Sequence, residues 1–203
     1  MKEEDFEESD DQEEFELWPF VPRLAPIPTV FHSLADGPFT RCMICERDLT
    51  EPSVRYLVER IFRGKEPIVE YALCFECQEG MCSELSEESL QRIEQFYQQL
   101  DFEARVERLR PHAESQDVSP WLENCLVTDN HVDDCHGYQI MGVFQGPYVE
   151  LSAIPMMLSS EAVEQILKLL SKKTRERLDD FMGDHFGMPP EFCEHPDFFP
   201  VLL

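Results

Sequence analysis

The hydrophobic and polar positions between residues 53 and 74 follow the pattern of two β-strands joined by a turn. The segments SVRYLVERIF and PIVEYALC are rich in β-branched and aromatic residues, and a polar stretch around Gly64 separates them. Gly64 supplies the positive φ that a tight turn needs. The sequence therefore predicts a β-hairpin in this region.

An amphipathic helix is predicted after the hairpin, beginning at Ser86. A serine caps a helix N-terminus well, and Glu87 and Glu88 would lie at the positive end of the helix dipole. The apolar face consists of Leu90, Ile93, Tyr97 and Leu100 and, after a shift in phase, Phe102, Val106 and Leu109. Pro111 is expected to end the helix.

The second half of the chain repeats this order of elements. It has a turn led by a cysteine, two strand-like runs around Phe144-Gln145-Gly146, a serine-capped helix from Glu161 and a short helix over residues 175–182. The fold class predicted from these patterns is α+β, with two hairpin-plus-helix units side by side.

The composition divides the chain into five segments. Residues 1–17 read as a disordered acidic tail and 18–40 as a proline-rich extended arm in which Trp18 and Phe20 are tucked in. The first unit spans 41–110, a linker spans 111–120, and the second unit spans 121–203, with a C-terminal helix and an apolar end, DFFPVLL, that is expected to pack on the core.

The charge of the chain excludes several classes of partner. The 203 residues carry 42 acidic and 17 basic side chains, a formal net charge of −25. Such a surface repels phosphate backbones and anionic lipid, so binding to nucleic acid or to a membrane surface is not expected. A protein partner with a basic surface fits this charge better.

Cysteine usage and hydropathy point to a reducing compartment. No stretch approaches the roughly 20 apolar residues of a transmembrane helix, and the acidic opening is unlike a signal peptide. The protein is therefore expected in the cytoplasm. Thiols stay reduced there, so paired cysteines favour metal binding over disulfides.

Four of the eight cysteines have the spacing of a metal site. Cys42 and Cys45 form one Cys-x-x-Cys pair, Cys74 and Cys77 form another, and 28 residues separate the pairs. Because the predicted hairpin runs out and back between them, the second pair would return beside the first. Four soft thiolates in a tetrahedron are typical ligands of zinc, so one Zn²⁺ per chain is predicted.

This arrangement resembles the four-cysteine zinc-ribbon and treble-clef fingers over residues 41–100. In those fingers a Cys-x-x-Cys turn, a β-hairpin and a second Cys-x-x-Cys leading into a helix share one zinc. The resemblance implies a metal site, but no particular function, because such fingers serve nucleic-acid binding, protein binding and purely structural roles.

Iron is the alternative metal, since rubredoxin-like sites have a similar spacing. Those sites favour a glycine after each pair, whereas Glu46 and Gln78 follow here. With zinc, four sulfur ligands leave no open position to activate water, so metal-catalysed hydrolysis is disfavoured.

Other groups of metal-binding residue types are weaker candidates. Cys82 is either a redox-active neighbour of the metal or a small buried side chain. A second site would draw on Cys125, His131, Cys135 and His136, but adjacent side chains on an extended backbone point to opposite faces. A still looser set near the end of the chain is Asp184, His185, Cys193 and His195.

The sequence leaves two function classes open. The first is a protein-interaction or scaffold module that uses its acidic surface, and the second is a redox or electron-transfer protein that uses the cysteine cluster. The chain lacks the Gly-x-Ser-x-Gly elbow, the P-loop and the dinucleotide-binding fingerprint, so an enzyme is not predicted.

The least expected prediction is that the second unit is a degenerate, metal-free copy of the first. RCMICERDL aligns with NCLVTDNHV, which pairs Cys42 with Cys125 and Cys45 with Thr128. In the same alignment Gly64 falls on Gly146. With three deletions in the second half, the alignment also pairs Pro67 with Pro147, Cys74 with Ile154, Cys77 with Met157, and Ser86 with Ser159. We therefore expect a monomer with internal pseudo-twofold packing of the two units.

Overall fold

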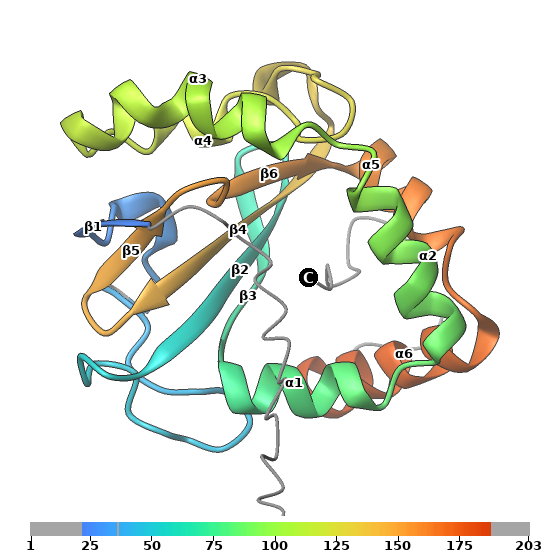
Figure 1. Ribbon diagram of the computed structural model, residues 1–203. Helices are drawn as coiled ribbons and strands as arrows, with labels where there is room; N and C mark the ends of the chain where they lie inside the picture. Colours follow the sequence, from blue (N-terminus) through green and yellow to red (C-terminus); the bar gives the residue numbers. More distant parts are fainter. Residues whose placement is uncertain (1–21, 36, 188–203) are drawn as a thin grey trace, which may run out of the picture.

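The computed structural model describes residues 22–35 and 37–187, and these residues form helices around one antiparallel sheet (Figure 1). Its strands are β1 (Arg23–Pro26), β2 (Arg55–Arg63), β3 (Glu66–Cys74), β4 (Gly137–Gln145), β5 (Tyr148–Leu151) and β6 (Met156–Ser159). The sheet has the order β1-β5-β4-β2-β3, and β6 also pairs with β4. The α+β class is therefore confirmed.

The helices lie above, beside and below the strands in the view of Figure 1. They are α1 (Phe75–Ser83), α2 (Glu87–Tyr97), α3 (Phe102–Ser115), α4 (Ser119–Leu122), α5 (Ser160–Leu167) and α6 (Lys172–Phe186), with short 3-10 helices η1 (Thr29–Phe31) and η2 (Val132–Asp134). None of these helices combines the length and apolar character needed to cross a lipid bilayer.

Strands β2 and β4 form the centre of the sheet, and their pairing is symmetric. Each has nine residues, and the antiparallel register runs from Arg55 opposite Gln145 to Arg63 opposite Gly137. Glu59 and Met141 consequently pair at the middle of both strands. The predicted hairpin is confirmed because β3 returns along the other side of β2.

The second half has three strands where the first half has the two strands of the hairpin. β5 pairs with the C-terminal end of β4, and β6 pairs with the N-terminal part of β4. β6 was not predicted. At the far edge β1 pairs with β5, so part of the proline-rich arm is a sheet strand.

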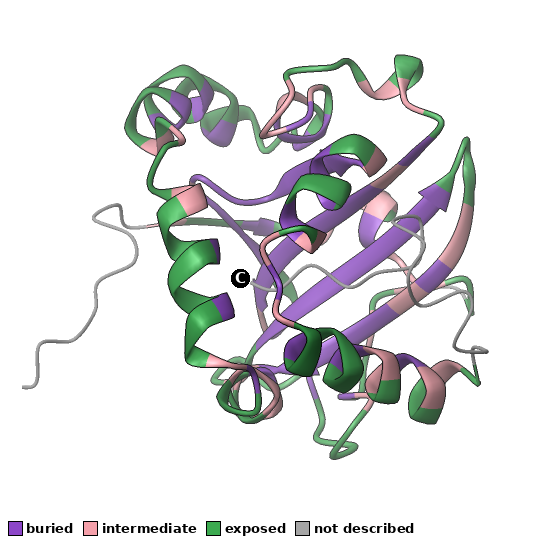
Figure 2. Ribbon diagram, turned by 90° about the vertical axis from the view of Figure 1, so that its right-hand side faces the viewer, coloured by how far each residue is buried: buried purple, intermediate pink, exposed green. Residues whose placement is uncertain are grey.

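Both faces of the central strands are covered, as the buried colouring along them in Figure 2 shows. On one face Phe31 of η1 contacts the ring of Phe144, which stacks on Tyr56, with centroid distances of 5.2 and 5.3 Å. On the other face Tyr71 contacts Phe181 and Phe186 of α6, at 6.0 and 5.8 Å. The core therefore lies on both sides of the sheet.

The predicted helix beginning at Ser86 is two helices. It breaks where the apolar pattern changes phase, and the Asp101 side chain accepts from the backbone N–H of Ala104 to start α3. The prediction that Pro111 ends the helix was wrong, since α3 continues to Ser115. Burial of Leu109 and Ala113 on either side of Pro111 keeps this segment helical.

Arg105 anchors α3 to the second half of the chain through hydrogen bonds. Its side chain is buried, and its guanidinium donates to the carbonyls of Ala153, Trp121 and Pro155 at 2.9, 3.0 and 3.0 Å. Burial lowers the pKa of this arginine to about 10. Three carbonyl acceptors compensate for the desolvation of the charge, so α3 is held on the β5–β6 connection.

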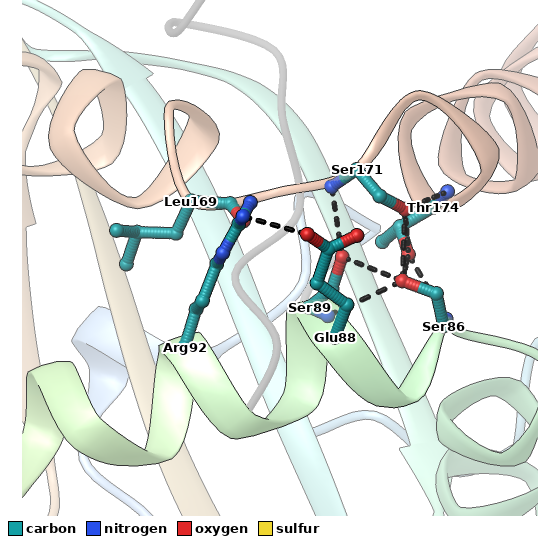
Figure 3. Close-up of polar contacts among 7 residues, drawn as sticks. All are labelled: Ser86, Glu88, Ser89, Arg92, Leu169, Ser171 and Thr174. Carbon is teal, nitrogen blue, oxygen red and sulfur yellow. Dashed lines mark hydrogen bonds and ion pairs between the residues drawn. The ribbon is translucent and has the colours of Figure 1, made fainter.

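Helices α2 and α6 meet at their N-termini in a reciprocal set of hydrogen bonds (Figure 3). The N–H of Ser86 donates to Thr174 Oγ1 at 3.0 Å, and the N–H of Ser171 donates to Ser89 Oγ at 2.8 Å. The hydroxyl oxygens of Ser86 and Ser171 lie 2.8 Å apart between them. We call these four residues the hydroxyl node.

The turns of the two halves have backbone hydrogen bonds at matching positions. The N–H of Leu49 donates to Thr40 O at 2.9 Å, and the N–H of Val132 donates to Glu123 O at 2.8 Å. At the hairpin turns, Gly64 and Gly146 both have positive φ, and each N–H bonds a carbonyl just before the opposite central strand. The matching therefore extends beyond the order of the elements.

Several predictions fall outside the described residues. They concern the acidic tail of residues 1–17, the positions of Trp18 and Phe20, and the apolar C-terminal end.

Candidate metal centre

The first cysteine pair lies in a tight turn before β2. The Cys42 N–H donates to Arg47 O at 3.0 Å, and the Glu46 N–H donates to Cys42 O at 2.9 Å. Glu46 adopts a left-handed φ of 58°, which lets the chain reverse after Cys45. The Met43 N–H donates to Ala72 O at 2.9 Å, so the turn is attached to the free side of β3.

The second pair lies where β3 becomes α1. Cys74 is the last residue of β3 and the N-cap of α1, and Cys77 is in the first turn of that helix. The Cys74 N–H donates to Cys42 Sγ at 3.4 Å, and Cys45 Sγ and Cys74 Sγ lie 3.6 Å apart. The hairpin therefore returns the second pair to the first, as the spacing predicted.

All four sulfur atoms lie within 4.8 Å of one another. A tetrahedral zinc–thiolate site has Zn–S bonds of about 2.3 Å and hence sulfur atoms about 3.8 Å apart. Cys42 and Cys74 are buried, Cys77 is half-buried and Cys45 is exposed. The cluster has the size and donor chemistry of a site for one soft cation.

Electrostatics also favour a cation at this position. Burial raises the pKa of Cys42, but N–H donors, including those of Cys45 and Cys74, more than offset this and leave it at about 7. Burial raises the pKa of Cys74 and Cys77, and the neighbouring thiols raise that of Cys77 further. Four thiolates at one point therefore require a positive ion to be stable.

A surface ion pair joins the two cysteine pairs. The Arg47 guanidinium donates to both carboxylate oxygens of Glu76, at 2.6 and 2.7 Å. Both side chains are well exposed, so the pair contributes little to stability. This contact was not predicted from the sequence. Its signal is a pair of opposite charges, because Arg47 lies two residues after Cys45 and Glu76 lies two residues after Cys74.

Cys82 lies apart from the four-cysteine cluster. Its thiol is half-buried and accepts from Gln78 Nε2 at 3.7 Å. Burial, followed by the charge of Glu79, raises its pKa. Cys82 therefore interacts with Gln78 and Glu79 and is not part of the four-cysteine cluster.

The second candidate set is not brought together as a metal site. Cys125 Sγ accepts the backbone N–H groups of Ser159 and Thr128, at 3.2 and 3.4 Å. His131 Nδ1 accepts the N–H of Asp133, and Cys135 donates to the carbonyl of His131. Among the described residues, the four-cysteine cluster is the only group of three or more Cys, His, Asp or Glu with metal-binding geometry.

The looser set near the C-terminus is described only in part. Asp184 and His185 belong to α6, and Cys193 and His195 lie outside the described residues.

The hydroxyl node was predicted only at Ser86. Its sequence signal is a repeated motif, Leu-Ser-x-x-Ser at residues 85–89 and Leu-Ser-x-x-Thr at residues 170–174. In both copies the serine caps a helix and accepts the N–H of the last residue of the motif. A search for paired caps would have found both halves of the node.

Comparison with known proteins adds no assignment to this geometry. No protein-family model, curated protein or solved structure was found to match the chain. What can be inferred about the cysteine cluster therefore comes from its own chemistry.

Proposed function

We propose that Cys42, Cys45, Cys74 and Cys77 bind one structural Zn²⁺, and that the chain is a metal-stabilised, acidic protein-interaction module. The observation that carries the proposal is the convergence of four sulfur atoms within 4.8 Å from a turn and a helix start. This donor set is typical of structural zinc.

The proposed role of the metal is conformational. Four thiolates fill the tetrahedral shell of zinc and leave no position for a reacting water. The free energy of metal binding then becomes folding free energy for the turn, the hairpin and α1. A structural role is supported further by the burial of Cys42 and Cys74.

The finer fold proposal is that the first half is a finger of the zinc-ribbon or treble-clef kind and that the second half is its degenerate copy. The finger is supported by the order turn, hairpin, helix, with Cys74 as the helix cap. The copy is supported by the symmetric β2·β4 register and the hydroxyl node. Both halves in one chain favour a monomer.

The proposed partner is a protein with a basic surface, met in the cytoplasm. A net charge of −25 supports a cationic partner and opposes nucleic acid or anionic lipid. A reducing compartment keeps the thiols available to the metal.

Metal analysis of aerobically purified protein tests the proposal directly. One zinc per chain and no visible chromophore are expected. A red colour with one iron per chain would instead support an electron-transfer site. Native protein without bound metal, after expression in zinc-supplemented medium, would contradict the proposed centre.

The interaction role needs a separate experiment. The wild-type chain and the Cys74→Ser variant are compared as baits, and the bound partners are eluted with salt. Partners retained by the wild type, lost with the metal and released by salt are expected. Equal capture by both baits would show that the metal does not support the interaction surface.

A redox-sensing role is the second candidate, and the exposure of Cys45 favours it. An accessible thiolate is open to peroxide, and its oxidation would release the metal. Zinc release at low peroxide, reversed by a thiol reductant, would favour sensing over scaffolding. Retention of zinc at concentrations that oxidise free cysteine would exclude it.

A further inference from the structure

The turn that begins at Cys125 has the backbone of the turn that begins at Cys42. The Asp129 N–H donates to Cys125 O at 3.0 Å, as the Glu46 N–H donates to Cys42 O at 2.9 Å. Asp129 and Glu46 have the same left-handed φ of 58°. The first two positions of the metal turn therefore correspond to Cys125 and Thr128.

The third and fourth positions follow from the attachment of each turn to its neighbouring strand. The Leu126 N–H donates to Met157 O at 2.8 Å, as the Met43 N–H donates to Ala72 O at 2.9 Å. Cys74 is two residues after Ala72, so its counterpart is two residues after Met157. That counterpart is Ser159, and the counterpart of Cys77 is Ala162.

This register corrects the one predicted from the sequence, which paired Cys74 with Ile154 and Cys77 with Met157. The element boundaries support the correction. Cys74 caps α1, and Ser159 caps α5. The hydroxyl node likewise pairs Ser86 with Ser171, not with Ser159.

The side chains at these positions repeat the contacts of the cysteine cluster. The Cys74 N–H donates to Cys42 Sγ at 3.4 Å, and the Ser159 N–H donates to Cys125 Sγ at 3.2 Å. Cys45 Sγ and Cys74 Sγ lie 3.6 Å apart. At the matching positions, Thr128 Oγ1 and Ser159 Oγ lie 3.3 Å apart.

The residues that flank the two clusters also correspond. Arg47 is bound to Glu76 across the cysteine cluster, and Asn130 Nδ2 donates to Glu161 Oε2 at 3.1 Å across the second turn. Glu76 and Glu161 each lie two residues after a helix cap. The match therefore includes the surface as well as the interior of the turn.

We propose that Cys125, Thr128, Ser159 and Ala162 form a latent metal site that accepts a second Zn²⁺ once its last three residues are cysteine. This inference rests on the proposed zinc at the first cluster. In the native sequence one thiol, two hydroxyls and a methyl group occupy the ligand positions. Neutral hydroxyls and methyl groups do not hold zinc in structural sites, so hydrogen bonds keep this turn closed.

The decisive experiment is the full-length variant Thr128→Cys/Ser159→Cys/Ala162→Cys. Bound zinc is counted after gel filtration, and cobalt substitution reports the ligands through sulfur-to-cobalt charge transfer. We expect two metals per chain, against one in the wild type, with a doubled cobalt–thiolate absorbance. Adding Cys125→Ser to this variant leaves three thiolates, so the second metal should be held less tightly and removed by a weaker chelator.

A matched control tests the register of the proposal. The variant Thr128→Cys/Ile154→Cys/Met157→Cys carries the same number of cysteines in the alignment predicted from the sequence. It should bind one metal. A second metal in this control, but not in the first variant, would overturn the proposed positions.

The remaining outcomes separate this inference from the proposed function. Wild type without metal would contradict the first site, whereas a metal gained by the variant and held less tightly after Cys125→Ser would still support the second. If the triple variant does not fold, the Thr128→Cys/Ser159→Cys variant offers three thiolates and should bind cobalt with a thiolate signature. One metal in a folded triple variant, or no added cobalt in this double variant, overturns the proposal.

Discussion

The two turns of this protein have one backbone and two different means of closure. At the first, Cys42 and Cys74 belong to a cluster of four sulfur atoms with few hydrogen bonds between side chains. At the second, Cys125, Thr128 and Ser159 bond to one another and to backbone N–H groups. The same backbone turn can therefore be closed by a cluster of sulfur atoms or by hydrogen bonds and packing. The halves should therefore differ in their response to metal loss.

Removal of the metal should have the largest effect and should fall on the first half. Zinc binding to structural sites is worth on the order of 10 kcal/mol, which the turn, β3 and α1 would lose on chelation or in Cys74→Ser. Hydrogen exchange should show lost protection over residues 41–110 and retained protection in β4 to β6. Unchanged melting after proven metal loss would contradict this.

Arg105→Met should have the next largest effect, on the second half. It leaves the buried carbonyls of Ala153, Trp121 and Pro155 without their donor, and we expect a loss of about 3 kcal/mol in the free energy of unfolding. Urea denaturation measures it. Arg108→Met, on the exposed side of the same helix, is the control and should change stability by less than about 0.5 kcal/mol.

The hydroxyl node should show coupling between the halves. Loss of a serine cap costs about 1 kcal/mol, so Ser86→Ala and Ser171→Ala should each destabilise by that order. Because their hydroxyls are 2.8 Å apart, the double variant should depart from additivity by about 0.5 kcal/mol or more. Strict additivity in a double-mutant cycle would show that the two caps act independently.

The pH dependence of stability should report Cys125. Burial raises the pKa of this thiol, but the hydroxyl and N–H groups of Ser159 and Thr128 lower it below its ordinary value of 9.0. The unfolded chain therefore binds more protons between the two pKa values, and stability rises with pH in that window. Cys125→Ala should remove this rise. An identical pH profile in the variant would contradict the assigned thiolate environment.

The smallest effect is expected from exchanging the surface contacts. Arg47→Asn gives the first turn the residue of the second, and Asn130→Arg does the reverse. Both sites are exposed, so neither melting temperature nor zinc content should change measurably. Loss of zinc in Arg47→Asn would show that the guanidinium supports the site after all.

The parts of the molecule that the sequence predicted are those with strong local patterns. Alternation and Gly64 located the first hairpin, and two Cys-x-x-Cys pairs located the cluster. The helix break at Asp101 and the continuation of α3 through Pro111 depend on packing of Leu109 and Ala113, which local pattern does not encode.

The alignment of the halves predicted from the sequence differs from the proposed register for a different physical reason. In the proposed register the nine residues of β3 correspond to the twelve residues 148–159, because a connection between β5 and β6 interrupts the returning strand. Similar residues, such as Pro67 and Pro147, therefore suggested deletions where the chain has an insertion. Hydrogen bonds to Ala72 and Met157 identify the register, and these need three-dimensional structure.

The β2·β4 pair at the centre of the sheet has two different residues at its midpoint. Glu59 is fully buried at the midpoint of β2, is bonded by the Tyr71 hydroxyl, and lies opposite Met141. In an assembly of two identical halves, the residue at this midpoint would face its own copy, and two buried carboxylates would repel each other. Linking the halves removes that requirement of self-complementarity. The midpoints of the two central strands can then differ, with the acid Glu59 on β2 and the thioether Met141 on β4.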